Sequence, residues 1–230
     1  MHVTRAETAR PVRENRQPAA MRDPVRRVAR LPGVPAVLAV TLLLLTGHQA
    51  MYTYVAPLAP GRTGLVLLVF GGATVAGIWI TGIVADSHLR PVLLTSLTLI
   101  AVAMLILSLA AREPTALLAA AALWGAAFGG APTLLQTALV DASGPASADM
   151  ATALQTTAYN VGIAAGSLAG SLALGSAGPA GLPWVTLSFT VAALGTAATA
   201  RRRAFPRDRR PRDRRPERGI PARGPLLPRA

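Results

Sequence analysis

Long stretches without a charged residue constrain the fold of this chain more than any other feature. No Asp, Glu, Lys or Arg occurs in residues 31–61, 63–85, 91–111, 114–140 or 150–200. Each stretch is as long as the roughly 20 residues that a helix needs to cross the hydrocarbon core of a bilayer. The pattern therefore predicts helices that cross a membrane.

The composition agrees with this prediction. Of the 230 residues, 52% are hydrophobic and only 14% are charged, which excludes an ordinary soluble globular domain. The chain has no cysteine, so disulfides, thiolate metal sites and cysteine nucleophiles are excluded.

The stretch 150–200 is long enough for two spans. Its segment LGSAGPAGLP, residues 174–183, carries the Gly and Pro residues that end one helix and begin the next. We predict an all-α fold, a polytopic membrane bundle of six transmembrane helices joined by connections short enough to make neighbours antiparallel. The predicted spans are 34–58, 64–85, 91–111, 115–140, 150–173 and 183–200.

The net charge of +13 would suggest nucleic-acid binding in a soluble protein, but its distribution argues against that class. Eight arginines lie in residues 1–30 and twelve in 201–230, on both sides of a nearly neutral apolar body. We divide the chain into a disordered Arg-rich leader (1–32), a six-helix bundle (33–200) and a disordered Arg/Pro-rich tail (201–230).

Arginine also predicts the orientation. An even number of spans places the leader, the tail and the 86–90 loop on one side, and leaves only Arg62 and Arg112 in loops on the other. Cytoplasmic segments carry the excess of basic residues, so we expect both termini in the cytoplasm of a multi-pass cell-membrane protein.

The fifth predicted span contains a small-residue face. Gly162, Gly166 and Gly170 lie four residues apart in VGIAAGSLAG, which lets a neighbouring helix approach closely. This helix-packing motif is common in membrane bundles and does not identify a function.

Polar side chains within the spans are costly and tend to face the protein interior or a water-filled cavity. His48 and Tyr52 share a helix face, Gln49 lies beside them, and the others fall in the fourth and fifth spans. We select as candidates for lining a mostly apolar substrate cavity His48, Gln49, Tyr52, Trp124, Gln136, Gln155, Tyr159 and Asn160.

Two interpretations of the polar groups are open. His48 either lines the cavity, where its imidazole could carry a proton, or is a neutral histidine bonded to a neighbouring helix. Gln155 and Asn160 are equally compatible with hydrogen bonds between helices. The chain lacks a His-Glu-x-x-His helix, a Gly-x-Ser-x-Gly setting and an acidic pair at mid-membrane depth, so we expect no enzyme, no metal and no cofactor.

A short charged island separates the second and third predicted spans. Asp86 ends one span, and Arg90 precedes Pro91, which opens the next. Asp at a helix C-terminus needs a nearby cation or the positive N-terminus of another helix. A solvated tight turn is the alternative interpretation.

The same island resembles the cytoplasmic loop motif of the major facilitator superfamily, in the weaker copy found in the second half of those transporters. Gly82, Asp86 and Arg90 match it, whereas Ser87 replaces a basic residue and Leu89 a glycine. Because of these two departures, we expect the loop to gate less tightly than its counterpart in the first half of those transporters.

Three longer stretches resemble the seventh, tenth and eleventh helices of the sugar-efflux-like branch of drug:proton antiporters. They are TGHQAMYTYVAPL (46–58), LWGAAFGGAPTLLQT (123–137) and ATALQTTAYNVGIAAGSLAG (151–170). The resemblance implies the C-terminal six-helix half of a proton-coupled efflux transporter for drugs or sugars.

The resemblance also implies partners. These are the lipid bilayer, a small-molecule substrate with protons, and a second six-helix half, present as a homodimer or a separate chain, whose helix would contact Asp86. Two alternatives are a truncated membrane fragment that does not transport and a membrane interaction protein whose Arg-rich tails bind anionic lipid.

Overall fold

The computed structural model describes residues 22–200, with the side chains of all but residues 22–24 and 85–87. Within that range the chain is helical and has no strand. Its elements are α1 (Arg22–Ala29), α2 (Val34–Tyr52), α3 (Val55–Leu58), α4 (Thr63–Ala110), α5 (Pro114–Ser143), the 3₁₀ turn η1 (Pro145–Ser147), α6 (Ala148–Ala177) and α7 (Gly181–Thr199).

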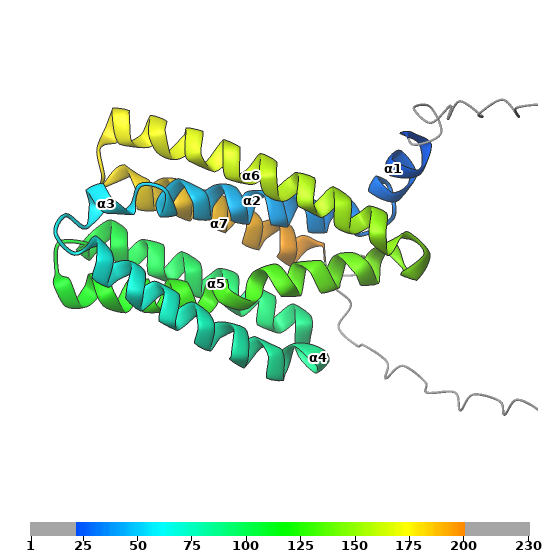
Figure 1. Ribbon diagram of the computed structural model, residues 1–230, viewed down its shortest axis with the longest axis horizontal. Coiled ribbons are helices and arrows are strands. Elements are labelled where there is room, and N and C mark those ends of the chain that lie inside the picture. Colours follow the sequence, from blue (N-terminus) through cyan, green and yellow to red (C-terminus); the bar gives the residue numbers. More distant parts are fainter. Residues whose placement is uncertain (1–21, 201–230) are drawn as a thin grey trace, which may run out of the picture.

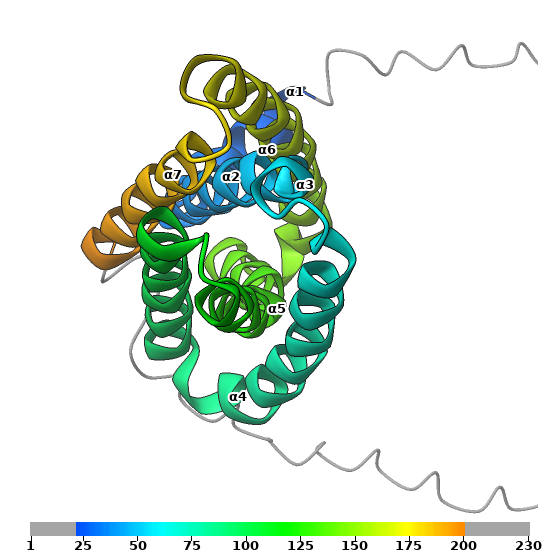
Figure 2. The same cartoon turned by 90° about the vertical axis from the view of Figure 1, so that its left-hand side faces the viewer.

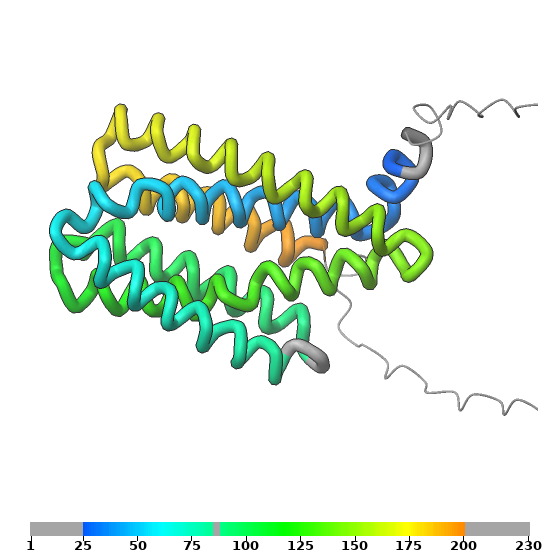
Figure 3. Tube along the Cα trace, viewed as in Figure 1, coloured from blue at the N-terminus to red at the C-terminus, as the bar shows by residue number. Residues whose placement is uncertain are grey.

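Within residues 22–200, six helical segments are long and apolar enough to cross a membrane, which confirms the predicted number of spans. Helix α4 supplies two of them, the first arm (Thr63–Val84) and the second arm (His88–Ala110). The other four correspond to α2, α5, α6 with η1, and α7. The Cα trace runs back and forth along one axis, so that consecutive spans are antiparallel (Figure 3).

The connection between the arms of α4 differs from the predicted loop. The backbone of residues 86–90 is helical except at His88, whose φ of −136° and ψ of 40° bend the chain. Pro91 follows three residues later, in the first turn of the second arm. An N–H group in the first turn has no acceptor within the helix, so the proline costs no hydrogen bond there. A bend of one residue therefore replaces a five-residue loop.

The first predicted span, 34–58, is too long at its C-terminal end. Helix α2 ends at Tyr52, and Pro57 lies in the separate short helix α3. A continuous helix would bring the Pro57 ring against the carbonyl group of Thr53 and leave that carbonyl without a donor. The break at residues 53–54 avoids both costs.

The leader is expected to be disordered as far as residue 32, whereas the structure has helix α1 within it. Val28 is buried against the bundle, whereas Arg26 and Arg27 on the opposite face are exposed. An apolar residue buried under a basic outer face is what an amphipathic helix provides. The remainder of the leader (1–21) and the tail (201–230) lie outside the described residues.

Two helices form the centre of the bundle. Of the residues in the most apolar window of each span, 61% are buried in α2 and 56% in α5, against 22% in α6 and in the first arm of α4. Viewed end-on, α5 lies between the two arms of α4, and α2 lies between α6 and α7 (Figure 2). One end of the bundle holds α1, the bend of α4, the α5–α6 turn and the end of α7 (Figure 1).

Glycines set the closest helix approaches. Gly162, Gly166 and Gly170 of α6 are all buried, and a Cβ on any of them would overlap atoms of α2 or of Tyr54 just beyond it. Gly125 and Gly129 of α5 lie in the same way against backbone carbonyls of the first arm of α4. Because a bilayer provides no hydrophobic force between helices, such backbone contact is a main source of association.

Candidate functional site

Five rings meet where α2, the first arm of α4 and α5 come together. This aromatic cluster consists of His48 and Tyr52 of α2, Phe70 of the first arm of α4, and Trp124 and Phe128 of α5. The His48 ring lies 3.6 Å from that of Phe128, 5.2 Å from that of Trp124 and 5.3 Å from that of Tyr52, centroid to centroid. The Phe70 and Trp124 centroids are 4.5 Å apart.

The sequence spacing explains how the cluster forms. Residues 48 and 52 are four apart on α2, and residues 124 and 128 are four apart on α5, so each pair occupies one helix face. Phe70 joins them because Gly125 has no side chain. A Cβ at Gly125 would overlap the Phe70 carbonyl group, so its absence lets α4 lie directly on α5.

Burial differs across the cluster. Trp124 is 1% exposed and His48 8%, whereas Tyr52 is 40% exposed and forms the outer edge. His48 Nδ1 and Trp124 Nε1 are buried and have no hydrogen-bond partner among the described groups. The cluster therefore combines stacked ring faces with two ring nitrogens that can still bond, an arrangement that suits a planar or cationic ligand.

The other predicted cavity residues do not join the cluster through any ring contact or hydrogen bond seen in the described part of the chain. Gln49 Nε2 donates to Thr53 Oγ1 at 2.9 Å, and Asn160 Nδ2 donates to the Thr156 carbonyl oxygen at 3.0 Å, each within its own helix. Gln136 is exposed on α5, and Tyr159 is half-buried.

Gln155 differs from these because it is buried, at 2% exposed, and its Nε2 atom has no partner among the described residues. It lies on the face of α6 that carries the three glycines. Within the same range, no group of three or more His, Cys, Asp or Glu side chains could hold a metal ion.

Helix α6 carries a polar stripe beside the face that packs on α2. Spacings of four, seven and four residues bring to one face Thr156, Asn160, Ser167 and Ser171, which are exposed or half-buried. Amide and hydroxyl groups at the surface of a membrane span need water or a protein partner. Thr156 Oγ1 and Asn160 Nδ2 already donate to carbonyl oxygens of α6, so the rest of the Asn160 amide and the two serines are the groups that favour a water-filled space or another helix over lipid.

The residues of the predicted gate motif lie around the bend of α4. Gly82 is exposed, and a Cβ placed there would meet no atom within 4 Å. The side chain of Asp86 lies outside the described residues. Arg90 is 5% exposed, and its Nη2 donates to the carbonyl oxygen of Ala198 in the last turn of α7, at 3.1 Å. A cation is favourable at a helix C-terminus, where the dipole is negative.

Phe70 and Phe128 are absent from the residues selected by sequence. Phe128 could have been found, since it lies one turn beyond Trp124 on the same face. Phe70 had no comparable signal, because only the packing of α4 on α5 brings it to the cluster.

The comparison with known families agrees with this architecture. Residues 33–229 match the model of the Major Facilitator Superfamily, so the match covers all six spans together with the aromatic cluster.

Proposed function

Because the chain belongs to the major facilitator superfamily, we propose that this multi-pass membrane transporter is a proton-coupled efflux carrier for small molecules such as drugs or sugars. The observation that carries the proposal is the aromatic cluster, which lies where α2, α4 and α5 meet. Rings around a buried imidazole and a buried indole N–H suit substrates with a planar or cationic part.

The transporter acts together with a second six-helix half. Carriers of this class are built from two such halves that rock about a central site. The low burial of α6 and its exposed polar stripe, Thr156, Asn160, Ser167 and Ser171, support a further protein surface or an aqueous path beside α6. A second copy of this chain or a separate polypeptide would fill this role.

The motif at Gly82, Asp86 and Arg90 acts as a gate at the cytoplasmic end, with both termini on the same side as the motif. Asp86 would contact the N-terminus of a helix in the other half and so stabilise one conformation. Asp86→Asn should then lower transport and leave membrane insertion unchanged. Full transport by that variant would remove the gate role.

Everted membrane vesicles from cells that express the full chain test transport, because they keep any partner that the membrane supplies. Ethidium, a planar cation, serves as the probe. Efflux from the cell predicts that ethidium accumulates in the vesicles when their interior is acidified, and that a protonophore abolishes the accumulation. Equal accumulation in vesicles without the chain would favour a fragment that does not transport.

A matched pair of tryptophan variants tests the cluster. Trp124→Ala removes a ring that is 1% exposed in the cluster, whereas Trp79→Ala removes one that is 75% exposed on the outer face of α4. We expect only Trp124→Ala to slow ethidium accumulation at equal amounts of protein in the membrane. Equal rates of ethidium accumulation in the two variants would show that the cluster does not lie on the substrate path.

A further inference from the structure

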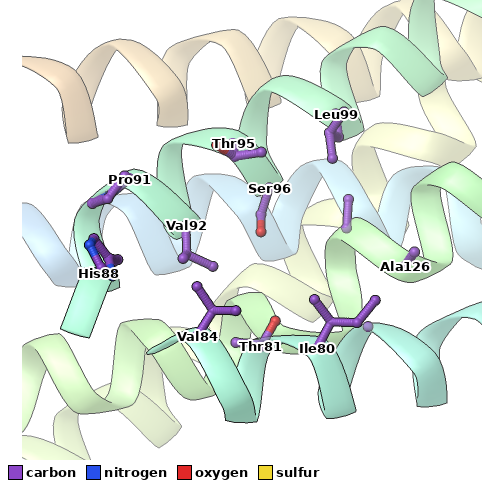
Figure 4. Close-up of a pocket in the computed structure, with 12 residues that line it drawn as sticks. Ile80, Thr81, Val84, His88, Pro91, Val92, Thr95, Ser96, Leu99 and Ala126 are labelled. Atoms are coloured by element: carbon purple, nitrogen blue, oxygen red, sulfur yellow. The ribbon is translucent and has the colours of Figure 1, made fainter. Parts of the chain in front are cut away.

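A second site lies apart from the aromatic cluster, between the two arms of α4. A pocket of about 410 Å³ opens near the bend, with Ala126 and Ala127 of α5 in its wall (Figure 4). Its volume falls within the range of pockets that hold small organic ligands. None of the residues selected as cavity candidates lines it.

The rim of the pocket is mostly apolar, and the exposed His88 and Thr95 are its polar members. Ile80 is 60% exposed, Val84 38% and Leu99 36%, and all three line the pocket. Large apolar side chains on the outer surface of a membrane span face the lipid hydrocarbon. A molecule dissolved in the bilayer can therefore reach the pocket without crossing water.

The inside of the pocket carries hydroxyl groups that are not used by the protein. Thr81 and Ser96 are each only 7% exposed, and their oxygens point toward one another from the two arms (Figure 4). Neither forms a hydrogen bond within the described part of the chain, and the same holds for Thr95 at the rim.

Other hydroxyls of α4 behave differently. Thr74 Oγ1 donates to the Phe70 carbonyl oxygen, and Thr98 Oγ1 to that of Leu94, both at 2.8 Å. Such bonds to the preceding turn are the usual way for Ser and Thr to satisfy their hydroxyls in a membrane helix. The Thr81 and Ser96 hydroxyls make no such bond and their oxygens point into the pocket, so an occupant of the pocket can bond to them.

We propose that the pocket binds an uncharged amphiphile, with an apolar body and a single hydroxyl or carbonyl group, that enters from the hydrocarbon of the bilayer. The apolar body contacts Ile80, Val84 and Leu99. The polar group bonds to Thr81 and Ser96. This proposal concerns binding and holds whether or not the ethidium experiment succeeds.

The test uses the purified full chain in lipid nanodiscs and a photoreactive fatty alcohol that carries a diazirine. After irradiation, mass spectrometry locates the crosslinks. We expect them on residues that line the pocket, and we expect dodecanol to compete about three- to tenfold better than dodecane because it can form the hydrogen bond. Crosslinks spread evenly over all exposed apolar faces would overturn the proposal.

Two exposed threonines of the second arm provide matched variants. Thr95→Phe places a ring over the pocket, whereas Thr98→Phe places the same ring one turn further on, outside the pocket. Crosslinking should be lost in Thr95→Phe and kept in Thr98→Phe, with both variants eluting as the unmodified chain does in size exclusion. Equal crosslinking in the two variants would contradict the site.

The role of the hydroxyls is tested separately. The combined change Thr81→Val and Ser96→Ala keeps nearly the same shape and removes both oxygens. We expect dodecanol and dodecane to compete equally in this variant, and an unchanged preference for dodecanol would show that the hydroxyls do not bind the ligand.

Lipid extraction from the purified proteins identifies the source of the amphiphile. An uncharged lipid with one hydroxyl or carbonyl group, enriched with the unmodified chain and Thr98→Phe over Thr95→Phe, supports the proposal with a bilayer lipid as occupant. If dodecanol competes for crosslinking but no lipid is enriched, the proposal is also supported, and the occupant is then a compound that reaches the bilayer from outside.

Discussion

The imidazole ring of His48 stacks on the phenyl ring of Phe128, with centroids 3.6 Å apart and planes inclined by only 5°. The two residues lie on α2 and α5, the two most buried spans of the bundle. Their stack therefore joins the centres of the two groups of helices, α2 with α6 and α7, and α4 with α5.

The stack predicts how His48 variants behave. We expect His48→Ala to slow ethidium accumulation about two- to tenfold, since an aromatic pair contributes about 0.5–1.5 kcal/mol beyond its buried area. His48→Phe keeps a ring and should retain most of the rate. Loss of all accumulation in His48→Phe would show instead that the imidazole nitrogens are required, as a proton-carrying role demands.

Gly166 predicts a packing defect. A Cβ there would lie 2.7 Å from Gln49 Cβ and would also overlap the Thr46 carbonyl oxygen, so Gly166→Leu must separate α6 from α2. We expect destabilisation of at least about 1–3 kcal/mol, measured by thermal unfolding in detergent. Gly175→Leu is the control, because a Cβ at Gly175 meets nothing within 4 Å. Similar losses in the two variants would mean that close approach to α2 is not the cause.

Arg90 predicts a local effect at the end of α7. Arg90→Met removes the donor to the Ala198 carbonyl oxygen and leaves an apolar chain of similar length. A hydrogen bond to a charged group contributes about 1.5–3 kcal/mol, so amide hydrogen exchange in the last turn of α7 should accelerate. Arg112→Met, at an exposed position, should leave that exchange unchanged. Unchanged exchange in Arg90→Met would show that α7 does not depend on this contact.

The absence of cysteine from the chain makes the orientation testable. Arg30→Cys and Arg112→Cys place single thiols at exposed positions at opposite ends of the bundle. With both termini in the cytoplasm, a membrane-impermeant maleimide should label Arg112→Cys in intact cells, and Arg30→Cys only after permeabilisation. The reverse pattern would invert the proposed topology.

If the transporter needs a second six-helix half, the size of the native product shows where that half comes from. An immunoblot of a C-terminally tagged native locus should show either a band near 23.7 kDa plus the tag or one near twice that mass. The smaller band means that the partner is a second copy or a separate chain, and crosslinking in membranes should then join two units. The larger band means that both halves belong to one polypeptide. A small band that never crosslinks would contradict the two-half proposal.

Much of the architecture follows from local sequence. The long stretches without charge predicted six spans, and the structure has six. The span ends were less accurate. The first span stops before Pro57, and α4 bends at the single residue His88. The fifth span was predicted as 150–173 and runs over Pro145–Ala177. Helical periodicity was enough to place His48 and Tyr52 on one face of α2. The same periodicity would have placed Phe128 with Trp124 on one face of α5.

Other features could not be derived from any one segment. The partner of Arg90 is the carbonyl group of Ala198, which is 108 residues away in the sequence, and Phe70 reaches the cluster only because Gly125 lies against its backbone. The pocket at Thr81 and Ser96 exists because the arms of α4 diverge at the bend while α5 packs between them.

The sequence by itself determined how many helices cross the membrane and where, because burying a charge in hydrocarbon is costly and a span needs a minimum length. The tertiary structure decided which helix faces meet and which polar groups remain unpaired. A bilayer surrounds every apolar face with equally apolar lipid, so hydropathy carries no information about neighbours. That choice depends on backbone contact at glycines such as Gly125 and Gly166, which only the folded chain brings together.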